Sequence, residues 1–470
     1  MPAAWPAARS TAGGDAALLA SGDVTASRIP PDRPPFTLRA RVLTPIGPGG
    51  TLDQPDGLVE VDTRGRIAAV RPAESDPLAA ERAVDLRPLV LLPGLVDLHA
   101  HLPQLPNAGL GSGLDLLTWL ERYIFPLERE FDDAEAAERL APAAFQAFAA
   151  AGTTTALLYG AVFAPSLDAA FRAAEAHGIR AIIGKVMMDR VTYDEAIDPK
   201  TILDVSLQQS ADLCARWHGR DDGRLGYAFT PRFAVSCTME MLRESAALAR
   251  STGAWWQTHI SEDRAEIAEV GRLFPEARDY VDVYDRAGGL GQRTVLAHAI
   301  HLSDRELGRL VETSTRVAHC PASNLFLASG VMPLARYLEA GLAVGLGSDV
   351  SAGPELSIFG AMRTGAYSQS AIRVSGDDRA VLGPLDWLRM GSLEGARVLG
   401  LADAIGSIET GKEADLIAVD PRLTAPLPGI DTPEPEDLVS RLMFRSHPEM
   451  VRAAWVRGRL LEGPAWAAAA

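Results

Sequence analysis

The sequence predicts an α/β protein whose larger part is a (β/α)8 TIM barrel, with a small β-sandwich domain built from both chain ends. Between residues 91 and 346, eight short apolar segments typical of strands alternate with amphipathic or alanine-rich helical segments. Eight such units over about 260 residues fit a barrel better than an open sheet. A doubly wound open sheet would carry a glycine-rich phosphate-binding turn, which this sequence lacks.

The expected elements of the barrel follow one another along the middle of the chain. The strand segments are residues 91–98, 154–159, 181–188, 225–229, 255–259, 294–298, 317–319 and 343–346. The helical segments between them include residues 134–151, 166–176, 239–251 and 304–312. Active sites of such barrels lie at the carboxyl ends of the strands, so the residues at those ends test this interpretation.

The two ends of the chain predict a second domain. Residues 1–35 are rich in Ala, Pro, Gly, Ser and Arg, which favours a mobile tail. Beyond them, short alternating runs predict strands, and similar runs return near the carboxyl end. These runs are residues 37–43, 57–62, 66–70 and 416–419, with a closing hairpin over 450–457 and 459–461. We expect a composite domain of residues 36–92 and 410–465 beside a barrel of residues 93–409.

Composition narrows the class of partner. The chain has 470 residues, of which 47% are hydrophobic and 23% charged, as in an ordinary protein with a large buried core. A net charge of -16 argues against nucleic acid or an anionic membrane as partner, so we expect a small-molecule substrate. Three cysteines without a Cys-x-x-Cys spacing indicate neither a disulfide framework nor a cysteine zinc site, which favours a reducing cytoplasm. No secretory or membrane-spanning segment is recognisable.

Polar side chains gather at the predicted strand ends. His99 and His101 end the first strand, and side chains at i and i+2 point to the same face of a strand. Each polar residue taken singly is more commonly structural. Together, five histidines, a glutamate and an aspartate around one barrel mouth predict a metal site. The other residues at the predicted strand ends are Arg232, His259, Glu262, His298, His319 and Asp349. Three further histidines, His177, His218 and His447, lie in segments predicted to be helices or loops and are expected to be structural.

Several longer motifs resemble one family. From about Phe36 to Leu461 the chain is similar to metal hydrolases of the amidohydrolase superfamily and, within it, to the guanine deaminases. The sequence departs from the pattern of the family at two places. Leu105 and Pro106 follow the first motif, and residues 353–355 stand where the family has a different loop. The motifs are PGLVDLHAHLPQ (93–104), TWLERYIFPLEREF (118–131), GKVMMDR (184–190), TPRF (230–233), THISEDRAEI (258–267), AHCPASNLFLASG (318–330) and GLGSDVSAG (345–353).

The resemblance and the donor chemistry together imply a single metal ion. Catalytic zinc sites use three or four protein ligands plus water, and histidine nitrogens with one carboxylate suit Zn²⁺. Relatives with two metals place a carbamylated lysine where this chain has Arg232, so we expect one Zn²⁺ per chain. Lys185 is expected to pair with Asp189 rather than to bridge metals. The expected ligands are His99, His101, His259 and Asp349.

The same resemblance implies the roles of the acid and base groups. A bound metal lowers the pKa of its water to roughly 7 and so supplies a nucleophile. Glu262, three residues after His259, is the expected general acid and base, which protonates the ring at N3 and then the leaving amine. Asp349 would also take a proton from the water. His298 would orient that water or polarise the adduct.

Three other residues are expected to recognise the purine. Guanine offers O6 and N7 as adjacent acceptors, which an arginine fork suits, and Arg232 is the candidate. Phe233 would form an aromatic wall against the ring, and Gln104 would hold ring nitrogens through its amide. For Gln104 and Phe233 the structural alternative is packing or a solvated loop. Trp119 and its neighbours would form either a lid or a dimer surface.

Three functions are compatible with these residues. The resemblance implies a homodimeric cytoplasmic guanine deaminase that makes xanthine and ammonia. A deaminase of a related ring, such as 8-oxoguanine or a pterin, is the first alternative and would lack the Arg232 contact. A non-catalytic barrel scaffold is the second, and it requires the loss of a ligand or of Glu262, which the sequence does not show.

Overall fold

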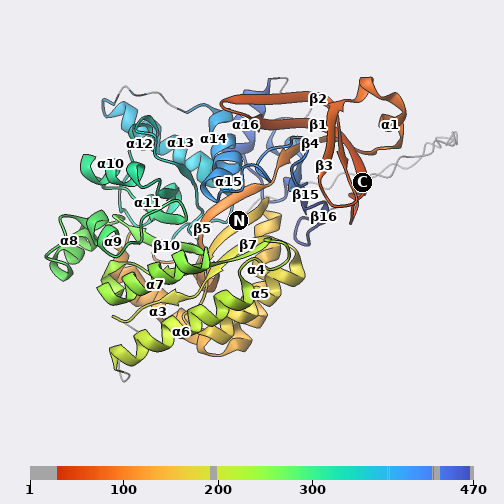
Figure 1. Ribbon diagram of the computed structural model, residues 1–470. Helices are drawn as coiled ribbons and strands as arrows, with labels where there is room; N and C mark the ends of the chain where they lie inside the picture. The colour runs from red at the N-terminus through yellow and green to blue at the C-terminus, as the bar shows by residue number, and fades with distance from the viewer. Residues whose placement is uncertain are drawn as a thin grey trace, which may run out of the picture.

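The computed structural model describes residues 29–190, 198–377, 379, 382–425, 427 and 434–465. Its main feature is a ring of eight parallel strands surrounded by helices (Figure 1). Residues 1–28 of the expected mobile tail lie outside the described residues. The barrel strands are β5 (Leu95–His101), β6 (Thr153–Tyr159), β7 (Arg180–Gly184), β9 (Leu225–Pro231), β10 (Trp255–Ile260), β11 (Thr294–His298), β12 (Arg316–His319) and β13 (Val344–Leu346). The predicted barrel is confirmed.

The ring is completed where its last strand meets its first. The backbone N–H of Asp349, just after β13, donates to the carbonyl of His99 on β5 at 2.7 Å. The N–H of His101 donates in turn to the carbonyl of Val350 at 2.9 Å. These two bonds bring the carboxyl ends of β13 and β5 together, so residues from both ends of the barrel sequence share one site.

The predicted apolar run 91–98 is not a single strand. It divides at Gly94, where β4 (Val84–Pro93) ends in one sheet and β5 begins in the barrel. The backbone N–H of Gly94 donates to Asp415 O, whereas that of Leu95 donates to Gly152 O. The run 181–188 likewise divides at Lys185 into β7 and the short β8 (Val186–Met187), which pairs with β9.

Helices cover the outside of the barrel, and local sequence sets their ends. Helices α8 and α10 begin with capping boxes, Asp263 with Glu266 and Ser303 with Glu306, which satisfy the first backbone N–H groups. The principal helices are α4 (Ala134–Ala150), α5 (Ala164–His177), α6 (Pro199–Trp217), α7 (Met239–Thr252), α8 (Arg264–Leu273), α9 (Tyr280–Arg286), α10 (Asp304–Glu312) and α13 (Ile358–Val374). Shorter helices are α1 (Pro77–Arg82), α11 (Pro321–Phe326), α12 (Leu334–Glu339), α14 (Pro384–Arg389), α15 (Gly395–Val398) and α16 (Pro435–Phe444).

A long excursion separates β5 from α4 and lies over the barrel mouth. It contains two short helices, α2 (Leu116–Trp119) and α3 (Phe125–Arg129), joined by the π-helical turn Leu120–Ile124. The Trp119 indole N–H donates to Leu110 O at 2.9 Å, and the Asn107 amide donates to Tyr123 O at 2.6 Å. Both bonds join residues within this segment, so they stabilise its conformation over the barrel mouth.

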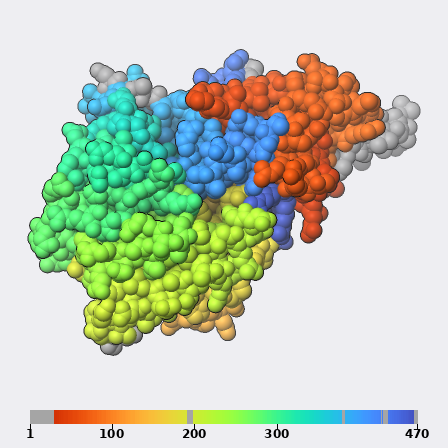
Figure 2. All heavy atoms as spheres, in the orientation of Figure 1, coloured from red at the N-terminus to blue at the C-terminus, as the bar shows by residue number. Residues whose placement is uncertain are grey.

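The two ends of the chain meet in one mixed sheet of seven strands. Its order is β16-β15-β14-β4-β1-β2-β3, in which β1 and β4 are parallel and the other pairs antiparallel. Trp455 is fully buried in its apolar core. Figures 1 and 2 show this region, coloured red-orange and dark blue, beside the barrel. The remaining strands are β1 (Phe36–Ile46), β2 (Gly50–Val61), β3 (Ile67–Pro72), β14 (Leu416–Val419), β15 (Val451–Val456) and β16 (Arg459–Leu460).

Within the described part of the chain, no helix combines the length and the apolar character needed to cross a membrane.

Candidate active site

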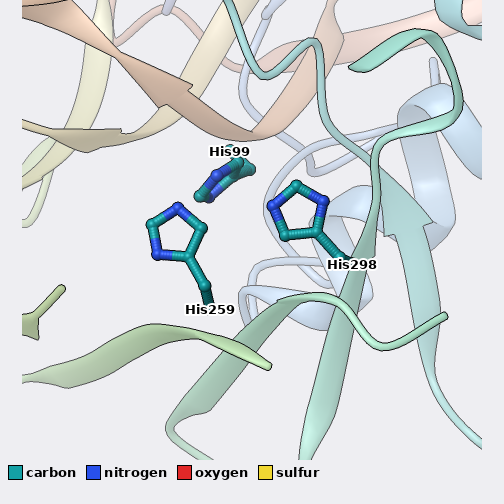
Figure 3. Close-up of side chains that lie close together, drawn as sticks. All are labelled: His99, His259 and His298. Atoms are coloured by element: carbon teal, nitrogen blue, oxygen red, sulfur yellow. The ribbon is translucent and has the colours of Figure 1, made fainter. Parts of the chain in front are cut away.

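Three imidazoles and a carboxylate meet at the carboxyl ends of the barrel strands. The Nε2 atom of His101 lies 3.2 Å from Nε2 of His99 and 3.2 Å from Nε2 of His259. Asp349 Oδ1 lies 3.2 Å from Nε2 of His99 and 3.4 Å from that of His101. The side chains of His99, His101 and Asp349 are buried, whereas that of His259 is partly exposed. Figure 3 shows the rings of His99, His259 and a further histidine, His298, side by side.

The ring nitrogens of this cluster are suited to a cation rather than to one another. The Nδ1 atom of His259 lies 2.5 Å from the carbonyl oxygen of Arg232, to which it must donate its proton. The Nε2 atom of His259 is then a bare lone pair, and it faces a second imidazole nitrogen. Burial lowers the pKa of His101 to about 4, so this ring is neutral as well. Converging lone pairs of neutral imidazoles, next to a carboxylate, fit a divalent metal.

Asp349 supplies the negative charge. Burial alone would raise the pKa of its carboxyl, but the imidazoles of His99, His101 and His298 outweigh that effect and hold the pKa well below its ordinary value. The carboxylate is therefore ionised in the pocket. Its backbone has a φ of 50°, and Ser261 and His298 also have positive φ values of 47° and 71°. Such conformations are sparsely populated and cluster at functional sites.

A second carboxyl group, Asp97, supports the ligands from behind. Its Oδ1 accepts hydrogen bonds from the backbone N–H groups of His99 at 3.1 Å and of Ser348 at 3.0 Å, and its Oδ2 accepts one from the Ser348 hydroxyl at 2.6 Å. Burial raises the pKa of Asp97 to about 7. Asp97 thereby joins β5 to the segment that carries Asp349. Sequence reasoning missed this role, although Asp97 shares the strand face of His99 and His101.

Glu262 and His298 lie beside the cluster. Glu262 Oε2 is 3.4 Å from His298 Nε2, and the Ser329 hydroxyl donates to Glu262 Oε1 at 3.3 Å. Burial, together with Asp349 and Glu266, raises the pKa of Glu262 well above its ordinary value, which favours the protonated form of the carboxyl group. Nδ1 of His298 lies 2.9 Å from Oδ1, the side-chain amide oxygen of Asn324. When Nδ1 donates there, Nε2 is left as an acceptor facing Glu262.

A pocket of about 390 Å³ joins these groups to the residues expected to bind substrate. Gln104, Arg232 and Phe233 all line it and are at most 5% exposed, so a solvated loop is excluded for them. Trp119 is 3% exposed and lines the same pocket, which makes it an inner wall rather than a dimer surface. The apolar lining is completed by Leu116, Leu120, Leu327 and Ala352.

Glu128 is a component of the pocket region to which the sequence assigned no role. Its Oε2 accepts from Nη1 of Arg232 at 2.7 Å, and its Oε1 accepts from Nε2 of Gln104 at 2.6 Å. Glu128 is 5% exposed. It belongs to the FP-x-E-x-x-F motif, which marked the family resemblance, but spacing along the chain does not connect it to Arg232, more than 100 residues away.

Two expectations for neighbouring residues change. His319, the fifth strand-end histidine, is fully buried and belongs neither to the pocket lining nor to the clusters of potential metal ligands among the described residues. The expected Lys185–Asp189 ion pair is wrong, because Lys185 Nζ donates to the Ser206 hydroxyl at 2.9 Å. Asp189 instead accepts from the backbone N–H of Thr238 at 2.7 Å.

The histidines expected to be structural have ordinary partners away from the pocket. Nε2 of His177 lies 2.8 Å from Glu462 O, and Nδ1 of His218 accepts from the Tyr227 N–H at 3.1 Å. Nδ1 of His447 accepts from the Glu449 N–H at 3.1 Å.

Comparison with known proteins agrees with this geometry. The model of the amidohydrolase family matches residues 90–461. The guanine deaminase of Escherichia coli (strain K12) is 36% identical over 384 residues, which make up 81% of this chain and 84% of that protein. The structure of a guanine deaminase from C. acetobutylicum, with guanine bound in its active site, superposes with a TM-score of 0.84 at 27% identity and covers 91% of this chain and 99% of the other.

A second structural relative carries a metal. An adenosine deaminase from Xanthomonas campestris, with bound zinc, has a TM-score of 0.76 at 28% identity and covers 93% of this chain and 95% of the other. The family match extends over most of the chain, and the sequence identity to a guanine deaminase extends over four fifths of it. The chain therefore belongs to the amidohydrolase family and, within it, to the guanine deaminases.

Proposed function

We propose that this protein is a zinc-dependent guanine deaminase that converts guanine and water into xanthine and ammonia. In this hydrolysis a water oxygen forms a bond to C2 of the ring, and the bond between C2 and the exocyclic nitrogen breaks. The observation that carries the proposal is a single pocket that holds a cluster of metal-type donors, the buried carboxyl group of Glu262 and a buried arginine. The family membership agrees with it, as does the guanine bound to the C. acetobutylicum relative.

Four residues would hold one zinc ion per chain. They are His99, His101, His259 and Asp349, of which His101 has its Nε2 within 3.4 Å of a ligand atom of each of the other three. Three imidazoles with one carboxylate form a donor set that suits Zn²⁺, and zinc is bound in the X. campestris relative. When bound, the cation acts as a Lewis acid and makes water nucleophilic at neutral pH.

Glu262 is the proposed acid and base. Because burial raises the pKa of its carboxyl group and so favours the protonated form, it would donate a proton to N3 of guanine as the ring loses aromaticity. The carboxylate left behind can then pass a proton from the attacking water to the departing amine. His298 faces Glu262 through Nε2 and would orient the water, while Asp349, ionised in its buried site, would accept a proton from it.

Arg232, Phe233 and Gln104 would bind the purine. The Arg232 guanidinium would face the six-position edge of guanine, which presents two acceptors. Phe233 would lie against the ring, and Gln104 would bond to polar atoms on the edge. Arg232 lines the pocket, so the feature that would favour a related ring such as 8-oxoguanine or a pterin is missing. The sequence keeps all four ligand candidates and Glu262, so the scaffold alternative, which requires the loss of one of them, loses its support as well.

We also propose that the protein acts as a cytoplasmic homodimer. The resemblance to the family supports the dimer. The three cysteines support a reducing compartment, since Cys214, Cys237 and Cys320 are all buried and unpaired. Light scattering of the purified protein should give twice the chain mass of 50.0 kDa. A mass of one chain would contradict the dimer.

The proposed function is tested on purified protein. We expect about one zinc per chain by elemental analysis, ammonia release from guanine, loss of that activity with a chelator, and recovery on adding Zn²⁺. Adenine, 8-oxoguanine and a pterin serve as the comparison substrates. Two metal ions per chain would contradict the ligand assignment, and faster turnover of a comparison substrate would contradict the choice of guanine.

A further inference from the structure

One buried carboxylate joins two of the side chains that would read the substrate. Glu128 accepts from Arg232 through Oε2 at 2.7 Å and from Gln104 through Oε1 at 2.6 Å. The three residues come from three separate stretches of chain: η2 (Leu102–Asn107), α3 and the end of β9. Each is at most 5% exposed, so these bonds are made away from bulk water. Charge-assisted hydrogen bonds in such surroundings are stronger and geometrically more exacting than neutral ones.

The same short helix contacts the arginine a second time. The guanidinium carbon of Arg232 lies 5.3 Å from the centroid of the Phe125 ring, within the range of a cation–π contact. Phe125 and Glu128 are three residues apart on α3 and so lie on one side of it. The segment FP-x-E therefore contacts the guanidinium of Arg232 twice: the Phe125 ring lies against its face, and the Glu128 carboxylate accepts a hydrogen bond at its edge.

We propose that Glu128 is a positioning residue that fixes the donor and acceptor pattern of the purine pocket. The inference deepens the proposed function and rests on it. Gln104 Nε2 donates to Glu128, which turns the amide oxygen Oε1 the other way, where it accepts from the Ser351 hydroxyl at 3.5 Å and keeps a lone pair for a further partner. Arg232 contributes donors only. The pocket would thus offer donors from one side chain and an acceptor from the other.

This pattern distinguishes guanine from adenine. Guanine presents an acceptor at O6 next to a donor at N1–H, which complements a guanidinium beside a carbonyl. Adenine presents a donor at its six-amino group next to an acceptor at N1, so both contacts would oppose like groups. A site built to hydrogen-bond one pattern strongly rejects the other, because buried polar groups would be left unpaired. Glu128 would therefore act on specificity through two neighbours, without touching the substrate.

The test compares Glu128→Gln with Glu130→Gln in the zinc-loaded full-length protein. Gln keeps the shape of Glu128 but removes its charge and can no longer accept two strong bonds at once. Glu130 is an exposed neighbour on the same segment and serves as the matched control. For Glu128→Gln we expect kcat/KM for guanine to fall roughly 10- to 100-fold, mainly through KM, because misplaced binding groups cost up to about 100-fold. The ratio of kcat/KM for guanine to kcat/KM for adenine should decrease, and the zinc content should stay at the wild-type level.

A purely structural role makes different predictions. It would lower the melting temperature of Glu128→Gln but leave KM and the guanine-to-adenine ratio of the folded protein at the values of Glu130→Gln. That result would overturn the inference. A double-mutant cycle with Arg232→Lys adds a second criterion. If Glu128 acts through Arg232, the double variant should lose much less than the product of the two single losses, and independent, multiplicative losses would also overturn it.

Calorimetric titration with xanthine separates this inference from the proposed function. Wild-type protein should bind xanthine, and Glu128→Gln should bind it at least several-fold more weakly than Glu130→Gln does. If the wild type neither binds xanthine nor releases ammonia from guanine, the proposed function fails and the inference fails with it. If the wild type does both and the two variants bind xanthine equally, only the positioning role of Glu128 fails.

Discussion

At the scale of single residues, Arg232 contacts both the proposed metal cluster and the pocket proposed to bind the purine. Its backbone carbonyl accepts from Nδ1 of His259 at 2.5 Å and so fixes which nitrogen of that ring faces the metal cluster. Its side chain lines the purine pocket. A carbonyl that fixes the tautomer of a ligating histidine is a recurrent feature of metal sites. The backbone function survives any substitution, so side-chain variants of Arg232 should alter recognition and spare the metal.

Glu262→Gln tests proton transfer. Glutamine keeps the shape of the side chain and can still bond to the Ser329 hydroxyl, but it cannot shuttle protons. We expect zinc to stay bound while kcat falls by roughly 100- to 10,000-fold, the usual contribution of a positioned acid or base. Steady-state assays with guanine and elemental analysis measure the two quantities. Turnover near that of the wild type would remove Glu262 from its proposed role.

Arg232→Lys tests recognition of the six-position edge. Lysine keeps the charge but loses the planar fork, which matters wherever two acceptors are bound together. A good bidentate pair contributes about 1 to 3 kcal/mol of discrimination, so kcat/KM for guanine should fall by about 5- to 150-fold with zinc content unchanged. If guanine turnover stays intact, Arg232 does not read that edge, and a related ring becomes the better substrate candidate.

At the scale of elements, Gly94 marks the change from the seven-stranded mixed sheet, called the end sheet below because both chain ends form it, to the barrel. A Cβ atom placed there would lie 2.0 Å from Oγ1 of Thr154, a stiff and buried side chain on β6. The close approach lets β4 and β5 run on in sequence while pairing in different sheets. An apolar run shows neither the break nor the change of sheet, because both halves are equally hydrophobic.

Gly94→Ala should therefore destabilise the protein. Overpacking of this kind costs about 1 to 3 kcal/mol in the free energy of unfolding. Gly308→Ala in α10 is the matched control, because a Cβ there meets nothing within 4 Å. Alanine in a helix interior should stabilise by about 0.5 to 1 kcal/mol. Chemical denaturation measures both changes, and a neutral Gly94→Ala would show that Thr154 yields without cost.

The sequence predicted the elements more completely than it predicted their contacts. Strand and helix order, the barrel and its strand-end histidines follow from periodicity and motif, and helix α10 has the expected bounds. The roles of Asp97 and Glu128 do not follow, because each depends on a partner more than 100 residues away. The Lys185–Asp189 pair failed for a related reason. Proximity in sequence suggested it, but Lys185 faces Ser206 on α6 instead.

At the scale of the whole molecule, a buried ion cluster joins the barrel to the end sheet. Arg180 at the start of β7 donates through Nε to Asp415 at 3.1 Å and also pairs with Glu413. Arg457, after β15, donates to Glu413 at 2.8 Å. The side chains of Arg180 and Asp415 are only 3% and 1% exposed. The cluster lies at the amino end of the barrel strands, opposite the pocket.

Arg180→Met tests how strongly this cluster holds the two parts together. Removing Arg180 leaves the buried carboxylate of Asp415 without its cation, although Glu413 keeps Arg457, and burial already raises the pKa of Asp415. Breaking a buried pair in this way costs about 3 to 5 kcal/mol. Arg172→Met is the control, because Arg172 is half exposed and pairs with Glu138 at 3.0 Å and with Asp168, which keeps Arg216 as a second partner. Its loss should cost at most about 1 kcal/mol. Urea denaturation followed by tryptophan fluorescence measures both losses, and guanine turnover of the folded variants should be unchanged. Equal losses for the two variants would mean that the barrel and the sheet are held together by apolar packing alone.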